Sequence, residues 1–353
     1  MKQVTLTDVA ARLGISKYSV SRALSGRSGV SEGTRRKVFD AARELGYRHA
    51  ALARPRLEAG RQSIVLLIPR HDVEDPEFWM GLISGASREA EALGYTFVTR
   101  PLERAGTDVP APRSEVAGVI VAGSRARSAL APYLEAGVPA SLVTYPEPLE
   151  PCDAVHSADF EGGAIVASHL VGLGHTHLAY VTEAPEKPSF AARARGFRET
   201  ALQLAGIEIE EIHIDPNEPG LSFEGAFRRL AERGHGPTGI LSSTDGLAFT
   251  VAWALGRIGL DVPSDVSLVG FNDAVESARF VPKLTTLRIP TEELGASAMR
   301  FLHERVVALD DRSPARRLQL IPTFVLREST APPRVTAITR GSHEAGTGER
   351  VDT

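Results

Sequence analysis

The chain has 353 residues, of which 42% are hydrophobic and 24% charged, a composition typical of a globular protein with two or three domains. Its single cysteine, Cys152, excludes an internal disulfide and a cysteine-based metal cluster, and no apolar run has the length of a membrane-spanning helix or the form of a signal-peptide core. Residues 1–61 carry 13 basic and 5 acidic side chains, a charge of +8, so the total of −4 leaves −12 for the remainder. A basic segment on an acidic body favours a DNA-binding module joined to another domain, with a solvated basic surface as the alternative.

The N-terminal segment predicts three short helices. Apolar residues recur at helical spacing over 6–13, and Gly14 ends that helix because glycine tolerates the left-handed conformation. Ser16 is placed to cap a second helix over 17–25, and Ser31 to cap a third. Two short helices joined by a Gly-Ile-Ser turn form a helix-turn-helix, whose second helix is expected to enter the major groove of DNA.

The polar face of the second helix supplies the expected DNA contacts. Lysine and arginine donate to guanine acceptors, and hydroxyl groups bond to phosphate oxygens. The expected base-reading residues are Lys17, Tyr18, Ser21 and Arg22. The expected phosphate contacts are Thr5, Ser16, Ser31, Thr34 and Tyr47. The alternative, a three-helix cap with a polar surface, leaves the dense polar face of residues 16–22 unexplained.

Three segments of this head keep a fixed spacing over the three helices: residues 5–16 (TLTDVAARLGIS), 20–24 (VSRAL) and 45–47 (LGY). They resemble the DNA-binding head of the lactose-repressor (LacI–GalR) family of bacterial transcription regulators. The similarity runs almost without gaps from residue 4 to residue 47. The resemblance implies that Lys17, Tyr18 and Arg22 are the main base readers.

The segment 49–61 resembles the linker and hinge helix of that family, with two departures. His49 stands where proline is frequent, and Pro55 falls inside the expected helix, where proline removes a backbone hydrogen bond. In the family this helix wedges a leucine into the minor groove, which bends the DNA. The resemblance implies hinge contacts from Leu52, Ala53 and Leu57, of which Leu57 is either the wedge or a linker leucine packed on the body.

From residue 62 onward, short apolar strands alternate with helices, which predicts parallel sheets covered by helices. Strands are expected at 64–68, 116–121, 140–143, 178–181, 239–242 and 266–270, and helices at 77–93, 125–136, 161–172, 190–205, 222–233 and 245–258. Residues 100–115 are rich in proline and predict a loop or one broken turn. The polar segment 331–353 predicts a disordered tail.

The body resembles the same family over nearly all its length, for example at residues 159–163 (DFEGG), 193–197 (RARGF) and 269–273 (VGFND). The resemblance implies an all-α helix-turn-helix head joined to an α/β periplasmic-binding-protein-like core of two doubly wound lobes. The expected divisions are a head at 1–48, a hinge at 49–61 and a core at 62–330, with lobe one at 62–160 and 290–322 and lobe two at 161–289 and 323–330.

The resemblance places an effector in the cleft between the lobes, in loops that follow the strands. Arg193 matches a family arginine that holds effector hydroxyls or a carboxylate, and its fixed fork of donors suits that role, with a surface arginine as the alternative. Asn272 replaces the usual aspartate, and Trp79 either stacks on a sugar face or packs internally. The expected effector contacts are His71, Asp72, Phe78, Trp79, Thr144, Phe190, Arg193, Thr244, Asp245 and Asn272, with Ser189 a weaker candidate.

We therefore expect a cytoplasmic, nucleoid-associated homodimer that binds a pseudo-palindromic operator and represses transcription under the control of a small effector, such as a carbohydrate. The alternative is an effector-independent regulator with a degenerate cleft. An enzyme is disfavoured because the nucleophile-elbow, P-loop and dinucleotide-binding motifs are missing from the expected strand ends. A transport binding protein would leave the basic head unexplained. We expect no cofactor, no metal site and no membrane partner.

Overall fold

The structure, a computed structural model, describes the chain in segments. The described residues are 5–24, 30–31, 33–34, 37–38, 41–42, 45, 62–69, 76–102, 116–123, 130, 133–145, 152–203, 206–214, 236–308 and 313–334. Several expectations lie outside them: the hinge with Leu52, Ala53 and Leu57, the phosphate contact Tyr47, the cleft residues His71 and Asp72, and the helix at 222–233.

The head contains two complete helices, α1 (Leu6–Leu13) and α2 (Lys17–Leu24). The backbone amide and the hydroxyl of Thr5 both donate to a carboxylate oxygen of Asp8 at 2.7 Å, which fixes the start of α1. Gly14 ends α1 with a left-handed φ of 65°. Both helices bury small apolar side chains against helical residues of the third expected segment. This core consists of Val9, Ala10, Val20, Ala23, Val38, Ala41 and Ala42.

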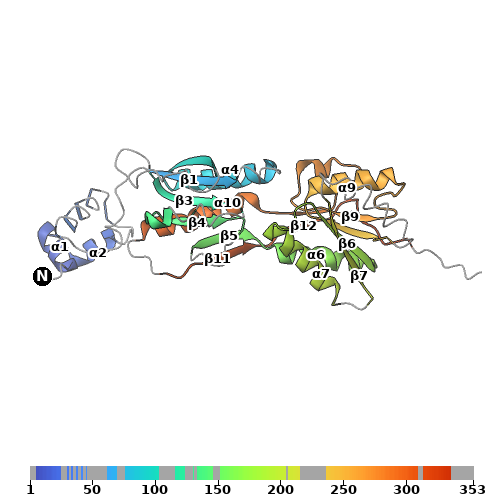
Figure 1. The fold of residues 1–353 in the computed structure, drawn as a ribbon. Helices are drawn as coiled ribbons and strands as arrows, with labels where there is room; N and C mark the ends of the chain where they lie inside the picture. Colours follow the sequence, from blue (N-terminus) through green and yellow to red (C-terminus); the bar gives the residue numbers. More distant parts are fainter. Residues whose placement is uncertain are drawn as a thin grey trace, which may run out of the picture.

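Lobe one is built on a six-stranded parallel sheet in the order β11-β5-β4-β3-β1-β2. The strands are β1 (Ser63–Pro69), β2 (Thr96–Leu102), β3 (Val116–Ala122), β4 (Ala140–Val143), β5 (Asp153–Ser157) and β11 (Arg317–Leu320). Helices α4 (Pro76–Ala92) and α10 (Thr291–Val307) lie alongside this sheet (Figure 1). The central strand β3 is buried along its whole length, as expected of a strand covered on both faces.

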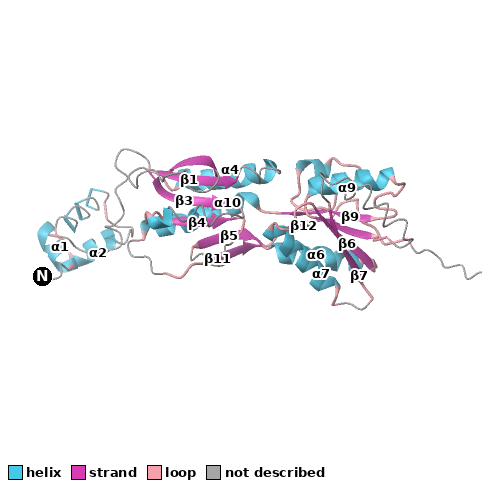
Figure 2. Ribbon diagram, viewed as in Figure 1, coloured by secondary structure: helices cyan, strands magenta, loops and turns pink. Residues whose placement is uncertain are grey.

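Lobe two has a four-stranded parallel sheet in the order β7-β6-β8-β9. The strands are β6 (His177–Thr182), β7 (Glu208–His213), β8 (Gly239–Ser242) and β9 (Ser267–Val269). The helices are α6 (Asp159–Gly172), α7 (Pro188–Ala201) and α9 (Asp245–Arg257). Figure 2 shows α9 on one side of this sheet and α6 with α7 on the other, the arrangement of a doubly wound fold.

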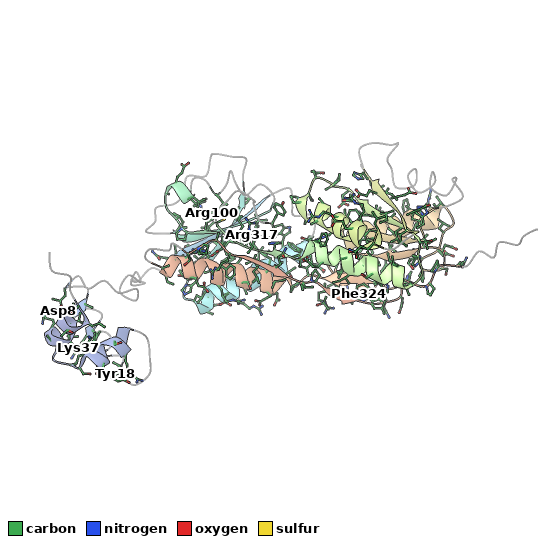
Figure 3. All side chains as sticks on the ribbon, turned by 90° about the horizontal axis from the view of Figure 1, so that it is seen from below. Asp8, Tyr18, Lys37, Arg100, Arg317 and Phe324 are labelled. Atoms are coloured by element: carbon green, nitrogen blue, oxygen red, sulfur yellow. The ribbon has the colours of Figure 1, made fainter. Side chains whose placement is uncertain are left out.

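The chain crosses between the lobes at Ala158, at Ile289–Pro290 and at Ile321–Pro322. After the last crossing, β12 (Thr323–Val325) pairs in antiparallel register with β10 (Thr286–Arg288) on the side of lobe two. Figure 3 shows the two sides of this crossing, with Arg317 of β11 in lobe one and Phe324 of β12 in lobe two. The core therefore has the two doubly wound lobes that the sequence predicts.

Glycines bring two helix pairs into close contact, one in each lobe. In lobe one, a Cβ on Gly85 of α4 would lie 1.9 Å from the carbonyl oxygen of Glu292 on α10. In lobe two, a Cβ on Gly163 of α6 would lie 2.1 Å from the carbonyl oxygen of Arg193 on α7. Because backbone atoms occupy the space of the missing side chains, each helix pair approaches closer than any larger residue would allow.

The structure differs from the sequence expectations at three places. Strand β2 continues through Pro101 to Leu102, so residues 100–102 are strand rather than loop, and residues 103–115 lie outside the described chain. Proline is tolerated there because β2 is an edge strand. Asp159 and Phe160, expected in lobe one, form the first turn of α6 in lobe two. Strands β5, β7, β10 and β11 were not expected.

The start of the expected tail is anchored on lobe two. The backbone amide of Ala331 donates to the hydroxyl of Ser267 at 2.9 Å, and His175 Nε2 lies 2.9 Å from the carbonyl oxygen of Ala331. Residues 331–334 are therefore ordered, and the rest of the segment lies outside the described residues. None of the described helices is long and apolar enough to cross a membrane.

Candidate functional site

Helix α2 presents the residues expected to read DNA bases. Ser16 caps the helix, because its hydroxyl accepts a hydrogen bond from the Ser19 backbone amide at 3.0 Å. Lys17, Tyr18 and Ser21 are exposed on the helix, and 67% of the Tyr18 surface is accessible to solvent. Tyr18 lies at the periphery of the head (Figure 3). The first turn of α2 thus carries a cation and hydroxyl groups that no part of the described head covers.

Two of the expected base readers bond to each other. Arg22 Nη1 donates to the Tyr18 hydroxyl at 2.7 Å, and the guanidinium lies 5.4 Å from the centre of the Tyr18 ring. The two residues are four apart and therefore lie on the same face of α2. This contact orders two long side chains before DNA binds, which reduces the entropy that recognition would cost.

Hydroxyl groups expected at phosphates occupy helix starts. The Thr34 backbone amide donates to the Ser31 hydroxyl at 3.2 Å, so Ser31 has the same capping role as Ser16. A helix N-terminus attracts anions, because its first amide groups point outward and its dipole is positive there. Thr5 differs, since its hydroxyl donates to the carboxylate of Asp8, which would repel a phosphate close by.

A cavity of about 700 Å³ lies between the two lobes. Lobe one contributes residues from the starts of α4 and α10 and from the ends of β3, β4 and β5. Lobe two contributes residues from the loop after β6, from the starts of α6, α7 and α9, and from the loop after β9. Seven of the ten expected effector contacts line it: Phe78, Trp79, Thr144, Phe190, Arg193, Thr244 and Asn272. The weaker candidate Ser189 lines it as well.

Arg193 projects from α7 into the wall of this cavity and is almost fully buried. Its Nε donates to Asp159 Oδ1 at 2.9 Å, and its Nη1 donates to the carbonyl oxygen of Ser243 at 2.5 Å. The guanidinium carbon lies 3.7 Å from the centre of the Phe271 ring. Burial raises the pKa of Asp159, and the adjacent guanidinium opposes that rise. The ion pair joins α6 to α7 and fixes the orientation of the arginine toward the cavity.

Thr144 and Asn272 bring strained backbone into the cavity from opposite lobes. Thr144 has a φ of 79° and follows β4, while Asn272 has a φ of 111° and lies just beyond β9. Positive φ is costly for residues with a Cβ and is found mainly where the surrounding structure imposes it. One such constraint on Thr144 is a hydrogen bond that its hydroxyl accepts from the Gly123 backbone amide at 2.9 Å. One such constraint on Asn272 is a hydrogen bond that its backbone amide donates to the carbonyl oxygen of Leu287 at 2.8 Å.

Asp245 lies beside the cavity and not on its wall. Its carboxylate accepts from the Thr286 hydroxyl at 2.6 Å, from the Ser277 hydroxyl at 2.8 Å and from the Ala274 backbone amide at 2.7 Å. Burial raises the pKa of this carboxyl group, and the three hydrogen bonds oppose the rise. We infer that Asp245 positions the loop after β9. Its neighbour Thr244 lines the cavity and caps α9 by accepting from the Leu247 amide at 3.2 Å.

Several polar cavity residues were not predicted from the sequence. Ser157 ends β5, Glu183 follows β6, and Asp159 begins α6. Each lies at or just beyond the carboxyl end of a strand, where doubly wound folds bind ligands, so a systematic reading of strand ends would have found them. The other unpredicted polar side chains in the lining are Glu77, Tyr145, Lys187 and Glu276.

A hydrogen bond between described residues crosses the cleft. Oε2 of Glu77, in the first turn of α4 in lobe one, accepts from the backbone amide of Val275 in lobe two at 2.8 Å. Glu77 and the neighbouring Glu276 both line the cavity. A ligand that enters here can therefore contact Glu77, whose hydrogen bond joins the two lobes.

The comparisons with known proteins cover both parts of the chain. Residues 5–49 match the family described as bacterial regulatory proteins, lacI family, and residues 167–330 match a periplasmic binding protein-like domain. The HTH-type transcriptional regulator DegA of Bacillus subtilis (strain 168) is 28% identical over 343 residues, which is 94% of this chain and 99% of that protein. The HTH-type transcriptional repressor PurR of Escherichia coli O139:H28 is 28% identical over 338 residues, 93% of this chain and 97% of that protein.

Two solved structures are similar over most of the chain. The complex of the transcriptional regulator CelR with cellobiose has a TM-score of 0.63 and 25% identity, covering 93% of this chain and 100% of that one. The lac repressor dimer bound to operator and the anti-inducer ONPF has a TM-score of 0.62 and 25% identity, covering 94% and 100%. The head, the two-lobed core and these similarities agree: the chain belongs to the lacI family of bacterial regulatory proteins and is a DNA-binding transcription regulator.

Proposed function

We propose that the chain is a homodimeric transcription repressor whose affinity for its operator is set by a small effector bound between the lobes. The observation that carries this proposal is the cavity of about 700 Å³ whose walls come from both lobes. Its size falls within the range of small-molecule sites. A ligand that touches both lobes binds one inter-lobe arrangement more tightly than another, and it shifts the population by that difference in affinity.

The lining suits an effector that carries hydroxyl groups. Phe78, Trp79 and Phe190 supply apolar surface, and Arg193, Thr144 and Asn272 supply hydrogen-bonding groups. CelR binds the disaccharide cellobiose in its solved complex, which supports a carbohydrate or a related metabolite as the effector here. The alternative is a regulator that binds its operator without any effector.

The head would bind one half-site of a pseudo-palindromic operator, and the second protomer would bind the other. The lac repressor acts on its operator as a dimer in its solved complex, which supports the same assembly for this chain. We place this activity in the cytoplasm, on the nucleoid. Lys17, Tyr18, Ser21 and Arg22 would read base edges in the major groove from α2.

Selection of binding sites from random DNA with the full-length protein tests the DNA-binding part of the proposal. Lys17→Ala is expected to weaken binding to the selected site by about 10-fold or more and to relax base preference, because a direct base contact contributes about 1–3 kcal/mol. Lys283→Ala, which removes an exposed lysine of lobe two paired with Glu328, is the matched control and should leave binding unchanged. Equal effects of the two substitutions would contradict the assignment of α2.

A thermal-shift screen of sugars, sugar amines, sugar acids, nucleosides and phosphorylated metabolites tests the effector. A true ligand stabilises the folded protein as its concentration rises above the dissociation constant. The same ligand should change operator affinity in the full-length protein. Intact operator binding with no response to any compound would favour the effector-independent regulator.

A further inference from the structure

The charge of Arg193 is already balanced within the protein. The Arg193–Asp159 pair is buried, with 5% and 7% of the two side chains exposed, and the Ser243 carbonyl takes a second guanidinium donor. Burial raises the pKa of Asp159, whereas the guanidinium and the position of Asp159 in the first turn of α6 favour its carboxylate form. Arg193 Nη2 has no hydrogen bond to a described residue, so the arginine can still donate one to a ligand. It offers little net charge to an anion.

The remaining charges of the cavity are mainly negative. Beyond the Arg193–Asp159 pair, the described lining contains three carboxylates, Glu77, Glu183 and Glu276, against the single cation Lys187. Glu183 is half-buried at the end of β6, and its Oε2 accepts from the Ser243 hydroxyl at 3.1 Å. An anionic ligand would face this excess of like charge, to which the half-buried Glu183 contributes more than the exposed Glu77 and Glu276.

A second observation points to a ligand in the same place. Ser157 ends β5 and lines the cavity with only 5% of its surface exposed, and its hydroxyl has no hydrogen-bond partner among the described residues. Buried hydroxyl groups are normally bonded, so this one is available to a polar group that enters the cavity. Trp79 lines the same cavity, and an aromatic face can also attract a cation, whereas the ring of Phe190 already has Lys187 and Arg193 near its centre.

We propose that the effector is a hydroxylated small molecule with a cationic amine, whose ammonium group is bound by Glu183 and whose hydroxyl groups are bound by Ser157 and Arg193 Nη2. This inference rests on the proposed effector role of the cleft. Phosphorylated and carboxylated metabolites are expected to bind more weakly, because the three glutamates outnumber the single lysine of the described lining. Neutral sugars of the same shape bind more weakly, because they leave Glu183 desolvated without a charged partner.

The test uses the full-length protein and matched sets of sugars. For glucose, galactose and mannose, the neutral hexose, its 2-amino derivative and its 6-phosphate are compared by thermal shift and calorimetry. The amine of at least one set is expected to bind about 10-fold more tightly than the neutral sugar, the gain of one charge-assisted contact. Glu183→Gln should remove that difference, because the amine loses its charged partner and a neutral sugar no longer leaves a carboxylate desolvated. Glu186→Gln, an exposed glutamate outside the cavity lining, is the matched control and should bind as the wild type does.

The outcomes separate this inference from the proposed function. A neutral sugar or a 6-phosphate that binds as tightly as its amine, or a panel in which no amine binds, overturns the assignment of a cationic effector. If such a neutral sugar or phosphate also changes operator affinity, the cleft remains the effector site and only its ligand class is wrong. An amine preference that survives Glu183→Gln overturns the role of Glu183.

Discussion

Substituting Gly163 by alanine tests how the helices of lobe two hold the cavity arginine. A Cβ at this position would lie 2.1 Å from the carbonyl oxygen of Arg193 and 2.8 Å from the backbone nitrogen of Phe197. Both are backbone atoms of α7, so no side-chain rotation relieves the contact. Helix α7 must move away from α6 by about 1 Å or more to restore ordinary van der Waals distances.

The magnitude follows from two opposing terms. Overpacking a core costs about 1–3 kcal/mol, and a clash between two backbones falls at the upper end. Replacing glycine by alanine inside a helix recovers about 1 kcal/mol. We therefore expect Gly163→Ala to lower the free energy of unfolding by about 2 kcal/mol. Gly172→Ala, in the last turn of the same helix with no atom within 4 Å of the added Cβ, is the control and should be neutral or slightly stabilising.

Equilibrium unfolding in urea measures both variants against the wild type. The affinity for a cleft ligand should fall in Gly163→Ala as well, because the displaced backbone is that of Arg193 itself. Gly172→Ala should bind the ligand normally. If Gly163→Ala were as stable as Gly172→Ala, the close packing of α6 against α7 would not be what fixes Arg193, and the reasoning would be refuted.

Two further predictions concern a buried carboxylate and a helix cap. Burial raises the pKa of Asp153, but hydrogen bonds from Arg305 and Arg316 outweigh it and lower the pKa to about 2. At pH values above the pKa of the unfolded state, the Asp153 carboxylate therefore stabilises the fold by about 2 kcal/mol. This stabilisation is lost as the pH falls through the pKa of the folded state. In urea unfolding, the stability difference between wild type and Asp153→Asn should therefore shrink between about pH 4 and pH 2. A constant difference over that range would contradict the ion-pair account. Ser16→Ala removes the helix cap and should lower the stability of α2 by about 1 kcal/mol, which hydrogen exchange would detect as faster exchange of the α2 amides. Ser21→Ala, in the middle of the helix, is the control and should leave this exchange unchanged.

The strands and helices that could be predicted from the sequence are those with a regular pattern of apolar residues. Strand β3 is a continuous apolar run, and it is buried along its whole length. Strand β7 was missed because it is an edge strand with the sequence EIEEIH, whose exposed glutamates give no buried run. Strand β5 was missed because Asp153 and His156 are polar, although both are buried in the fold. Arg305 and Arg316, more than 150 residues away, make the burial of Asp153 possible, and no local pattern reveals that pairing.

The candidate site was predictable to a similar extent. Arg193 could be placed because it matches a family arginine, and the aromatic residues could be placed because they lie in loops that line the cleft; the structure brings them together around one cavity. Glu183, a carboxylate that decides the charge of the cavity, was missed although it directly follows β6, a position where doubly wound folds bind ligands. Whether Arg193 is a free cation or half of an ion pair depends on the contact between α6 and α7, which only the folded chain defines.

The central claim is that a ligand in the cleft and an operator on the head affect each other's binding. Fluorescence anisotropy with a DNA site selected by the full-length protein gives operator affinity without ligand and at saturation with the best ligand of the screen. Calorimetry gives ligand affinity with and without that DNA. We expect the two affinities to change by the same factor, in the range of about 5- to 150-fold, because coupling between two sites is reciprocal. An operator affinity that is unchanged at a saturating concentration of cleft ligand would contradict the account.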